Sequence, residues 1–258
     1  MAIQTFMRYE NKYVITDKKK DIILPALLQY MEFDKYCIGD KDYPIYSLYF
    51  DTENNDVVRR SVQKPYYKEK LRLRSYKLNP NDDDTVFLEI KKKIGGIVNK
   101  RRVVLTYKQA VDFIKHNKIP QLSGIQKQIM NEICYYVNLH PIQKSVLIHY
   151  DRTALFGKDD HSLRITFDRN LTSDNNSDIL RTEHYGKFIV EPDTRIMEIK
   201  ISGATPLWLS DILTENKIYR SSFSKFGRNF QNETRYSVSQ KKLVPEKEFC
   251  PSPILLHN

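Results

Sequence analysis

The chain has 258 residues, 40% of them hydrophobic, and its 42 lysines and arginines exceed its 32 acidic residues to give a formal charge of +10. This length and apolar content predict one large β-rich domain, residues 1–240, followed by a Pro-containing tail at 241–258 that we expect to be flexible. The positive charge favours an anionic partner, but charge alone does not separate nucleic acid, acidic lipid and phosphate compounds.

Two further features narrow the class of protein. No stretch approaches the roughly 18 consecutive apolar residues of a membrane span, so the sequence predicts no span of its own. The cysteines, Cys37, Cys134 and Cys250, are far apart and show neither metal-ligand spacing nor an even disulfide framework. Since the N-terminal segment also lacks the apolar core of a signal peptide, we expect a cytoplasmic protein, with attachment to the inner face of a membrane through a partner as the alternative.

Alternation of apolar and polar residues with period two dominates the chain and predicts strands. In chain order, the first half is predicted to form a strand at residues 8–15, a helix at 17–34 that Pro25 interrupts or kinks, and strands at 45–51, 68–76, 86–93 and 98–105. A turn at 79–84 and a hairpin at Gly95 and Gly96 join the last three strands. Thr106 is expected to cap a helix at Tyr107–His116, and another helix follows at 124–137.

The second half continues with strands at 145–154, 162–168, 187–190 and 196–201, and with a polar, mobile loop at 172–178. A last helix is predicted at 205–215, where Pro206 suits the first turn. About nine strands and four helices indicate an α+β domain, and this number of strands is enough for a barrel.

The cations share one face of most predicted strands. In the strand at 68–76, for example, Arg72 and Arg74 alternate with Leu71 and Leu73. For any single strand, an ordinary sheet with its charged face in water is the simpler interpretation. That interpretation is less satisfactory for seven strands at once, because the apolar faces of the helices must also be covered. We therefore favour a barrel with helices outside and charged faces inside.

Such an interior requires an anion. Burying one unpaired ion costs several kcal/mol, and roughly ten inward cations cannot all pair with about four carboxylates. Arginine suits phosphate because its planar fork donates two hydrogen bonds to two oxygens, and lysine acts as a mobile point charge. The interleaved carboxylates could hold a divalent metal through oxygen ligands.

An ordered set of motifs resembles the VTC domain, the catalytic domain of vacuolar transporter chaperone polyphosphate polymerases, in the triphosphate tunnel metalloenzyme (CYTH-like) superfamily. The matching stretches are RYENKYVI near the start, SLYFDT at 47–52, KLRLRSY at 70–76, FLEIKKK at 87–93, NKRRV at 99–103, HYDRTAL at 149–155, LRITFDRNL at 163–171, IMEIKISG at 196–203 and SSFSKFGRN at 221–229. The resemblance implies a closed antiparallel barrel of about eight strands with helices packed outside. It also implies transfer of the γ-phosphoryl group of ATP to a growing polyphosphate chain, with Mn²⁺ or Mg²⁺.

The resemblance also assigns roles by motif. The implied catalytic residues are Arg72, Arg74, Arg152, Arg164 and Lys225. The implied substrate-binding residues are Lys12, Lys91, Lys100, Arg102, Tyr150, Lys200 and Ser224. Glu198 is the implied metal ligand, and Glu10, Glu89 and Asp168 are weaker candidates for which internal ion pairing is the alternative. For Tyr150 the alternative is a packed aromatic, and near Lys100 both Arg101 and Arg102 offer similar charges.

One departure bears on the reaction. Hydrolytic relatives begin with E-x-E-x-K, whereas this chain has Arg8 before Glu10 and Lys12, and fewer carboxylates favour transfer over hydrolysis. The expected partners are ATP and inorganic polyphosphate, with a membrane protein for product handling as a further candidate. A triphosphatase acting on tripolyphosphate, a nucleotide or an RNA 5′ end stays open, as does a non-catalytic polyphosphate-binding module. The 17 tyrosines are scattered and do not form a base-stacking face, so nucleic acid is not expected.

Overall fold

The computed structural model describes residues 9–37, 41–182 and 186–243, with side chains described up to residue 236. The expectations for Arg8 and for the tail from residue 244 onward therefore lie outside the described residues.

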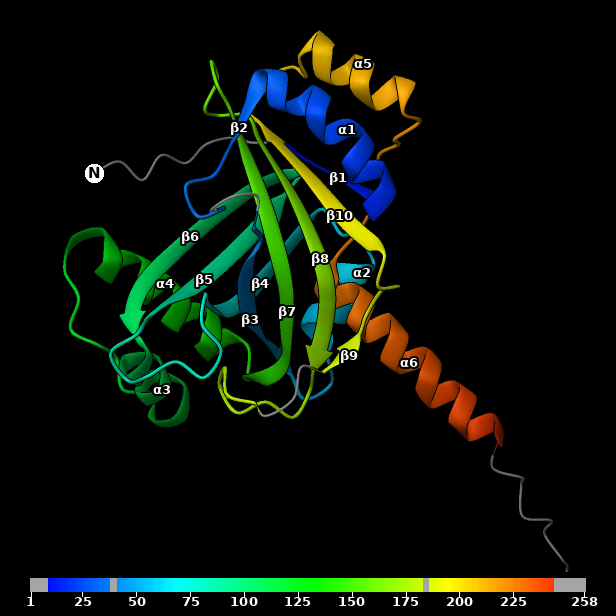
Figure 1. Cartoon of the computed structure of the whole chain (residues 1–258). Coiled ribbons are helices and arrows are strands. Elements are labelled where there is room, and N and C mark those ends of the chain that lie inside the picture. Colours follow the sequence, from blue (N-terminus) through cyan, green and yellow to red (C-terminus); the bar gives the residue numbers. More distant parts are fainter. Residues whose placement is uncertain (1–8, 38–40, 183–185, 244–258) are drawn as a thin grey trace, which may run out of the picture.

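Ten strands form one antiparallel sheet (Figure 1). The main path runs β1 (Tyr9–Thr16), β10 (Thr194–Ile201), β8 (Arg164–Asp174), β7 (Ile142–Gly157), β3 (Tyr43–Thr52), β4 (Tyr67–Ser75), β5 (Thr85–Ile94) and β6 (Ile97–Thr106). Two short strands lie off this path: β2 (Met31–Phe33) pairs with β7, and β9 (Lys187–Phe188) pairs with β8. The mixed α+β class and the antiparallel sheet expected from the sequence are confirmed.

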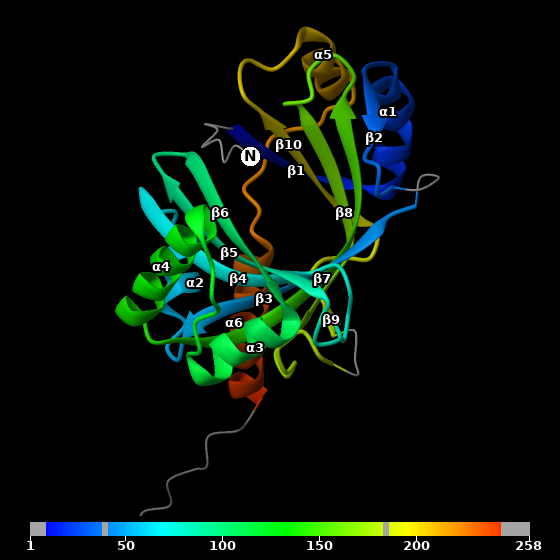
Figure 2. The ribbon, with the colours of Figure 1, turned by 90° about the vertical axis from the view of Figure 1, so that its left-hand side faces the viewer.

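The expected closed barrel is not formed. The ladders run from β1 to β6, and within the described part of the chain no ladder joins these two outer strands. The sheet bends into a deep trough, with β1, β10 and β8 on one wall and β4, β5 and β6 on the other (Figure 2). The outer edge of β1 instead meets the segment that leads to the last helix, where the Ser221 amide donates to the Lys12 carbonyl over 2.7 Å.

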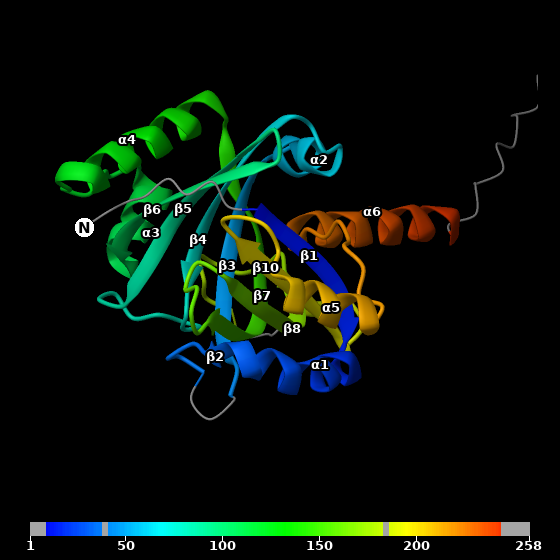
Figure 3. The same ribbon diagram turned by 90° about the horizontal axis from the view of Figure 1, so that it is seen from above.

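Alternation decides which side chains face into the trough, as the sequence predicted. On β4, Leu71 and Leu73 are buried on the outer face, whereas Arg72 and Arg74 line the interior. The helices cover the apolar outer faces at the two ends of the sheet (Figure 3). The helices α3 (Tyr107–His116) and α4 (Gly124–Leu139) pack on β3 to β6, and α1 (Asp17–Tyr30) and α5 (Leu207–Glu215) pack on β1, β8 and β10.

Local sequence signals explain some helix ends, and tertiary pairing explains others. Thr106 caps α3 through a capping box with Gln109, as predicted. The helix expected at residues 17–34 ends earlier, at Tyr30, because Met31 begins β2 and pairs with Gly157 of β7. Pro25 lies inside α1 without ending it. The polar loop expected at 172–178 begins later, since residues 172–174 complete β8.

Two helices escaped the sequence analysis. The first, α2 (Asp56–Val62), is short, and buried Asp51 accepts hydrogen bonds from the amides of Val57 and Val58 in its first turn. The second, α6 (Lys225–Leu243), is mostly polar, but Phe223 and Phe226 at its start pack inside the trough as part of an apolar cluster. The start of α6 therefore helps to fill one part of the interior. None of the helices within the described residues combines the length and the apolar character needed to cross a lipid bilayer.

Candidate functional site

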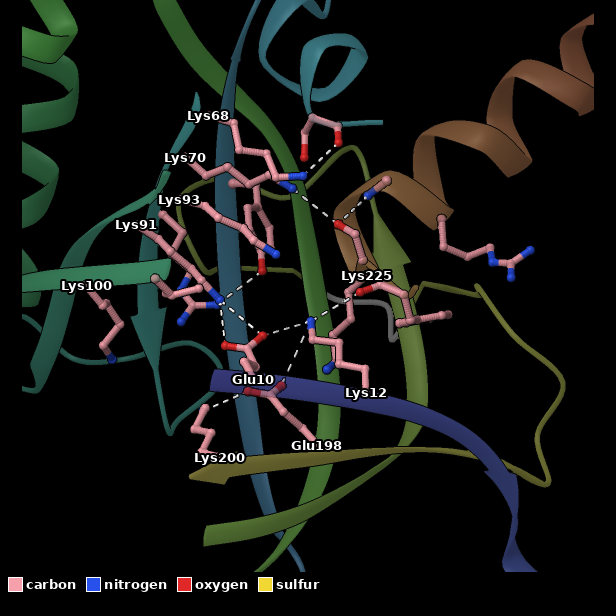
Figure 4. A pocket seen from close by; sticks show the side chains of 18 of the residues that line it. Glu10, Lys12, Lys68, Lys70, Lys91, Lys93, Lys100, Glu198, Lys200 and Lys225 are labelled. Carbon is pink, nitrogen blue, oxygen red and sulfur yellow. Dashed lines mark hydrogen bonds and ion pairs between the residues drawn. The ribbon is translucent and has the colours of Figure 1, made fainter. Parts of the chain in front are cut away.

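The interior of the trough contains a cavity of about 990 Å³. Of the described residues, seventeen lysines and arginines line it, against only two carboxylates, Glu10 and Glu198. Figure 4 shows several of these side chains reaching toward one another from β1, β4, β5 and β10. The basic strand faces converge on one cavity, as expected, but this cavity lies in a trough of an unclosed sheet and not in a closed barrel.

Most of the site residues proposed from the sequence line this cavity. They are Glu10, Lys12, Arg72, Arg74, Lys91, Lys100, Arg102, Arg152, Arg164, Glu198, Lys200, Ser224 and Lys225. Tyr150, Glu89 and Asp168 do not line it, because each is buried behind the cations that it contacts. No histidine of the described residues lines the cavity.

Glu89 organises the first cluster of cations. Its carboxylate is fully buried on β5 and accepts hydrogen bonds from Arg72 Nε over 2.8 Å and from Lys100 Nζ over 2.8 Å. Arg102 Nη2 also lies 3.1 Å from Glu89 Oε1. Burial opposes ionisation, but the surrounding cations outweigh it and hold the pKa of Glu89 well below its ordinary value. Glu89 thus acts as a buried counterion that orients three cations.

Asp168 organises the second cluster. It accepts a bidentate pair of hydrogen bonds from Arg152, at 2.6 and 2.8 Å, and a further one from Lys225 of α6. Burial raises the pKa of Asp168, but Arg152 and Lys225 outweigh burial and lower this pKa to about 2. The carboxylate therefore ties β7, β8 and the start of α6 together.

Tyr150 lies beneath the second cluster and shares its cations. Its hydroxyl accepts a hydrogen bond from Arg74 Nη2 over 3.2 Å, and Lys225 Nζ lies 4.3 Å from its ring centroid. Burial raises the pKa of Tyr150, but the fields of Arg74, Arg152 and Lys225 outweigh it and lower the pKa to about 8. Tyr150 thus positions cations rather than facing the cavity.

Glu10 and Glu198 form the third cluster, at the surface of the cavity (Figure 4). Lys12 Nζ lies 3.3 Å from Glu10 and 4.0 Å from Glu198, so the two carboxylates face the same ammonium group. Lys91 donates to Glu10 over 3.0 Å, and Lys200 Nζ lies 2.8 Å from Glu198. Burial and Glu198 raise the pKa of Glu10, but the lysines outweigh both and lower it to about 2.

Arg164 lies apart from these clusters on β8. Its Nη2 atom donates to Asp34 Oδ2 over 3.2 Å and to the Tyr43 hydroxyl over 3.3 Å. Its Nε–H group is buried and has no hydrogen-bond partner within the described part of the chain. Because a buried donor without a partner is costly, this guanidinium is available to an acceptor that enters the cavity.

The implied metal must be held by few protein ligands. Among the described residues, no group of three or more His, Cys, Asp or Glu side chains lies together with a geometry that could hold a metal ion. Glu89 and Asp168 are saturated by cations, which leaves Glu198 and Glu10. Two carboxylates with hard oxygen donors fit Mg²⁺ or Mn²⁺ only if phosphate oxygens and water supply the remaining ligands, as is common for phosphate-bound Mg²⁺.

The sequence analysis left several cavity residues without a role. Lys68, Lys70 and Lys93 follow the same period-two pattern as the assigned cations on β4 and β5 and could have been found from it. Arg220 and Arg228 flank the segment that enters α6 and have no strand periodicity that would reveal them. The start of α6 was assigned from its motif, and the structure brings it against β7 and β8.

Comparisons with known proteins agree with this geometry. The sequence profile of the VTC domain matches residues 7–232. A search of curated proteins found no match. A solved structure of a candidate adenylate cyclase from Bacillus halodurans has 11% identity and a TM-score of 0.52, and the alignment covers 85% of this chain and 94% of that one. At this identity the similarity supports the fold alone.

Two other solved structures align with lower scores. A protein of Pyrococcus horikoshii has 13% identity and a TM-score of 0.44, with 87% of this chain and 99% of that chain covered. The Mimivirus capping enzyme triphosphatase has 11% identity and a TM-score of 0.35, with 82% and 88% covered. Scores this low add nothing to the assignment of function.

Proposed function

Because the chain belongs to the VTC domain family, within the tunnel-fold (CYTH-like) superfamily, we propose that it is a polyphosphate polymerase. It transfers the γ-phosphoryl group of ATP to the end of a growing inorganic polyphosphate chain. The observation that carries the proposal is the single cavity lined by seventeen cations and two carboxylates. A cavity with such an excess of positive charge attracts a compact polyanion.

The inner cations support the role of phosphate ligands. Arg72, Arg74 and Arg152 are held in fixed orientations by Glu89, Tyr150 and Asp168, so their remaining N–H groups are already aimed when a substrate binds. A planar guanidinium can donate to two phosphate oxygens at once. These residues would bind the reacting phosphates and neutralise the charge that builds up on their oxygens during transfer.

The transfer itself needs no protein base. A terminal oxygen of the polyphosphate chain, already ionised at neutral pH, attacks the γ-phosphorus of ATP. The bond from the γ-phosphorus to the bridging β–γ oxygen breaks, and ADP leaves with the electron pair on its β-phosphate. Phosphoryl transfer of this kind depends on positioning and charge neutralisation, which Arg72, Arg74, Arg152 and Lys225 are placed to supply.

A divalent metal would be held by Glu198 together with Glu10. When bound, it would supply further charge neutralisation at the phosphate oxygens. In the protein alone, Lys200 and Lys91 occupy these carboxylates. These lysines would therefore have to turn toward the phosphates as the metal arrives, which their flexible stems allow.

The test is an assay with ATP and either Mn²⁺ or Mg²⁺. We expect long polyphosphate chains visible on a gel, and we expect Arg72→Ala and Lys225→Ala to lower their rate of formation by about 100-fold or more. Lys108→Ala, on the outer helix α3, serves as a matched control, and circular dichroism checks that each variant is folded. Release of phosphate without polymer would show a triphosphatase instead. Tight binding of polyphosphate without any turnover, with an affinity that Glu198→Ala does not change, would show a non-catalytic binding module.

A further inference from the structure

On the wall formed by β4, β5 and β6, the strand register sets three successive rows of side chains that follow the position of Arg74. The first row is Arg72, Glu89 and Arg102, in which positive and negative charges alternate. The next row is Lys70, Lys91 and Lys100, and the outermost row is Lys68, Lys93 and Val98. Lysines thus lie directly opposite lysines in both outer rows.

This arrangement is unfavourable in the absence of an anion. Like charges directly opposite each other on neighbouring strands destabilise a sheet. Lys91 is relieved by Glu10, and Lys100 turns toward Glu89. Of the five lysines in these two rows, Lys68, Lys70 and Lys93 have no ion pair with a carboxylate of the described residues (Figure 4).

The partners of these three lysines are weak or absent. Lys68 Nζ donates to the Ser61 carbonyl over 3.0 Å, and Lys70 Nζ donates to Ser224 Oγ over 3.2 Å. For Lys93 the described residues supply no hydrogen bond and no ion pair. Burial lowers the pKa of all three, and neighbouring cations lower it further. For Lys93 these effects outweigh the attraction of Glu10, which raises the pKa, and the pKa of Lys70 falls to about 7. An anion placed among these lysines would pair with their buried charges and offset the repulsion between them.

The rows extend the site beyond the reacting phosphates. Side chains two residues apart on one face of a strand are separated by about 7 Å, so the lysine rows carry the positive lining about 13 Å past the row of Arg72. The cation type also changes along this path, from arginines oriented by buried counterions to lysines without them. Lysines bind phosphate as mobile point charges, which suits a chain that must advance as it grows.

We propose that Lys68, Lys70 and Lys93 form an outer subsite that binds the part of a linear polyphosphate chain extending beyond the reacting phosphates. This inference rests on the proposed function, because it assumes that the inner cavity takes a phosphate chain. It adds that the protein distinguishes long chains from short ones, through residues that the inner site does not use.

The test compares the binding of tripolyphosphate with that of longer linear polyphosphate by titration calorimetry at one low salt concentration. The variant is Lys68→Met with Lys93→Met, which leaves the hydrogen bond between Lys70 and Ser224 in place. We expect the wild type to bind the longer chain more tightly. The double variant should lose about tenfold in affinity for the longer chain and keep its affinity for tripolyphosphate within about twofold.

The control is Lys108→Met with Lys118→Met, which removes the same two charges from exposed positions in and next to α3. It should keep the preference for long chains. Equal loss of affinity for both ligands in the Lys68 and Lys93 variant, or no loss at all, would overturn the outer subsite. A single-stranded oligonucleotide that binds more tightly than polyphosphate through these lysines would overturn the ligand class.

The same experiment separates the two proposals. A wild-type protein that binds neither phosphate ligand contradicts the proposed function, whereas one that binds both equally contradicts only the outer subsite. A second measurement uses the ligand-free protein, in which Lys93→Met should raise Tm because it removes repulsion from Lys68 and Lys91. An unchanged or lower Tm would argue against the repulsion between lysines from which the subsite is inferred.

Discussion

At the scale of single residues, crowding of cations moves two groups into the neutral pH range. Lys70 has a pKa of about 7 because burial and four neighbouring cations disfavour its ammonium form. Tyr150 has a pKa of about 8 because three cations outweigh the effect of burial. Both shifts have the same origin, a high density of positive charge in a partly dehydrated cavity. Both groups therefore respond to the arrival of an anion.

The affinity for tripolyphosphate should fall as the pH rises from about 7 to about 9. Lys70 loses its positive charge in this range and Tyr150 gains a negative one, and each change weakens the attraction for an anion. By linkage, the bound anion raises both pKa values, so binding takes up protons. The affinity for tripolyphosphate should depend less on pH in Lys70→Met and in Tyr150→Phe than in the wild type, as measured by titrations across this range. Since the ligand's own ionisation is common to all three proteins, profiles of identical slope would refute the assignment.

At the scale of elements, the start of α6 links the fold to the cavity. Ser224 accepts a hydrogen bond from the Gly227 amide over 3.1 Å, which is the geometry of a helix N-cap, and it also accepts from Lys70. The next residue, Lys225, reaches Asp168 on β8. A change in this cap is therefore felt by both the helix and the cations around it.

Ser224→Ala should lower the free energy of unfolding by about 1 kcal/mol, because it leaves an amide of the first turn of α6 without its acceptor. It should also weaken tripolyphosphate binding, since Lys70 loses its partner. Denaturant unfolding and calorimetry measure the two effects. Ser202→Ala, at an exposed position that does not line the cavity, is the matched control and should change neither. Equal behaviour of the two variants would contradict the capping role.

At the scale of the whole molecule, buried ion pairs join segments that are far apart in the chain. Fully buried Asp168 of β8 pairs with Arg152 of β7 and with Lys225 of α6. Its pKa of about 2 lies below the ordinary value of 3.8. The stability that it contributes is therefore complete above about pH 4 and is lost as the pH falls through about 2. The pKa of Glu10 is also lowered to about 2, so ionised Glu10 contributes stability that is lost over the same acid range.

Asp168→Asn should lower the free energy of unfolding by about 3 kcal/mol at neutral pH, because Arg152 and Lys225 would be left buried without a counterion. Added tripolyphosphate should restore part of this loss by supplying negative charge. The variant should also lose less stability than the wild type between about pH 4 and pH 2. Tm measured against pH for both proteins tests this. A variant with the acid profile of the wild type would show that ionised Asp168 does not hold β7, β8 and α6 together.

Much of the fold and of the candidate site could be predicted from the sequence. The spacing of Arg72 and Arg74 against Leu71 and Leu73 placed the cations on one face, and that face lines the cavity. The cap of α3 at Thr106 could also be predicted, because it depends on residues close together in the chain. Short α2 and polar α6 were missed because the apolar residues of each that pack in the core, Val58 with Val62 and Phe226 with Phe230, are too few to define a helical period.

Which face of each strand is charged follows from the order of the residues, because alternation depends only on neighbours in the chain. The depth of each charge and the group opposite it depend on how the strands and helices pack. Glu89, Asp168 and Tyr150 lie behind the cavity, Lys68 faces Lys93, and β1 meets the Ser221 segment instead of β6. These outcomes depend on strand register and on which distant segments pack together, and no local pattern encodes either.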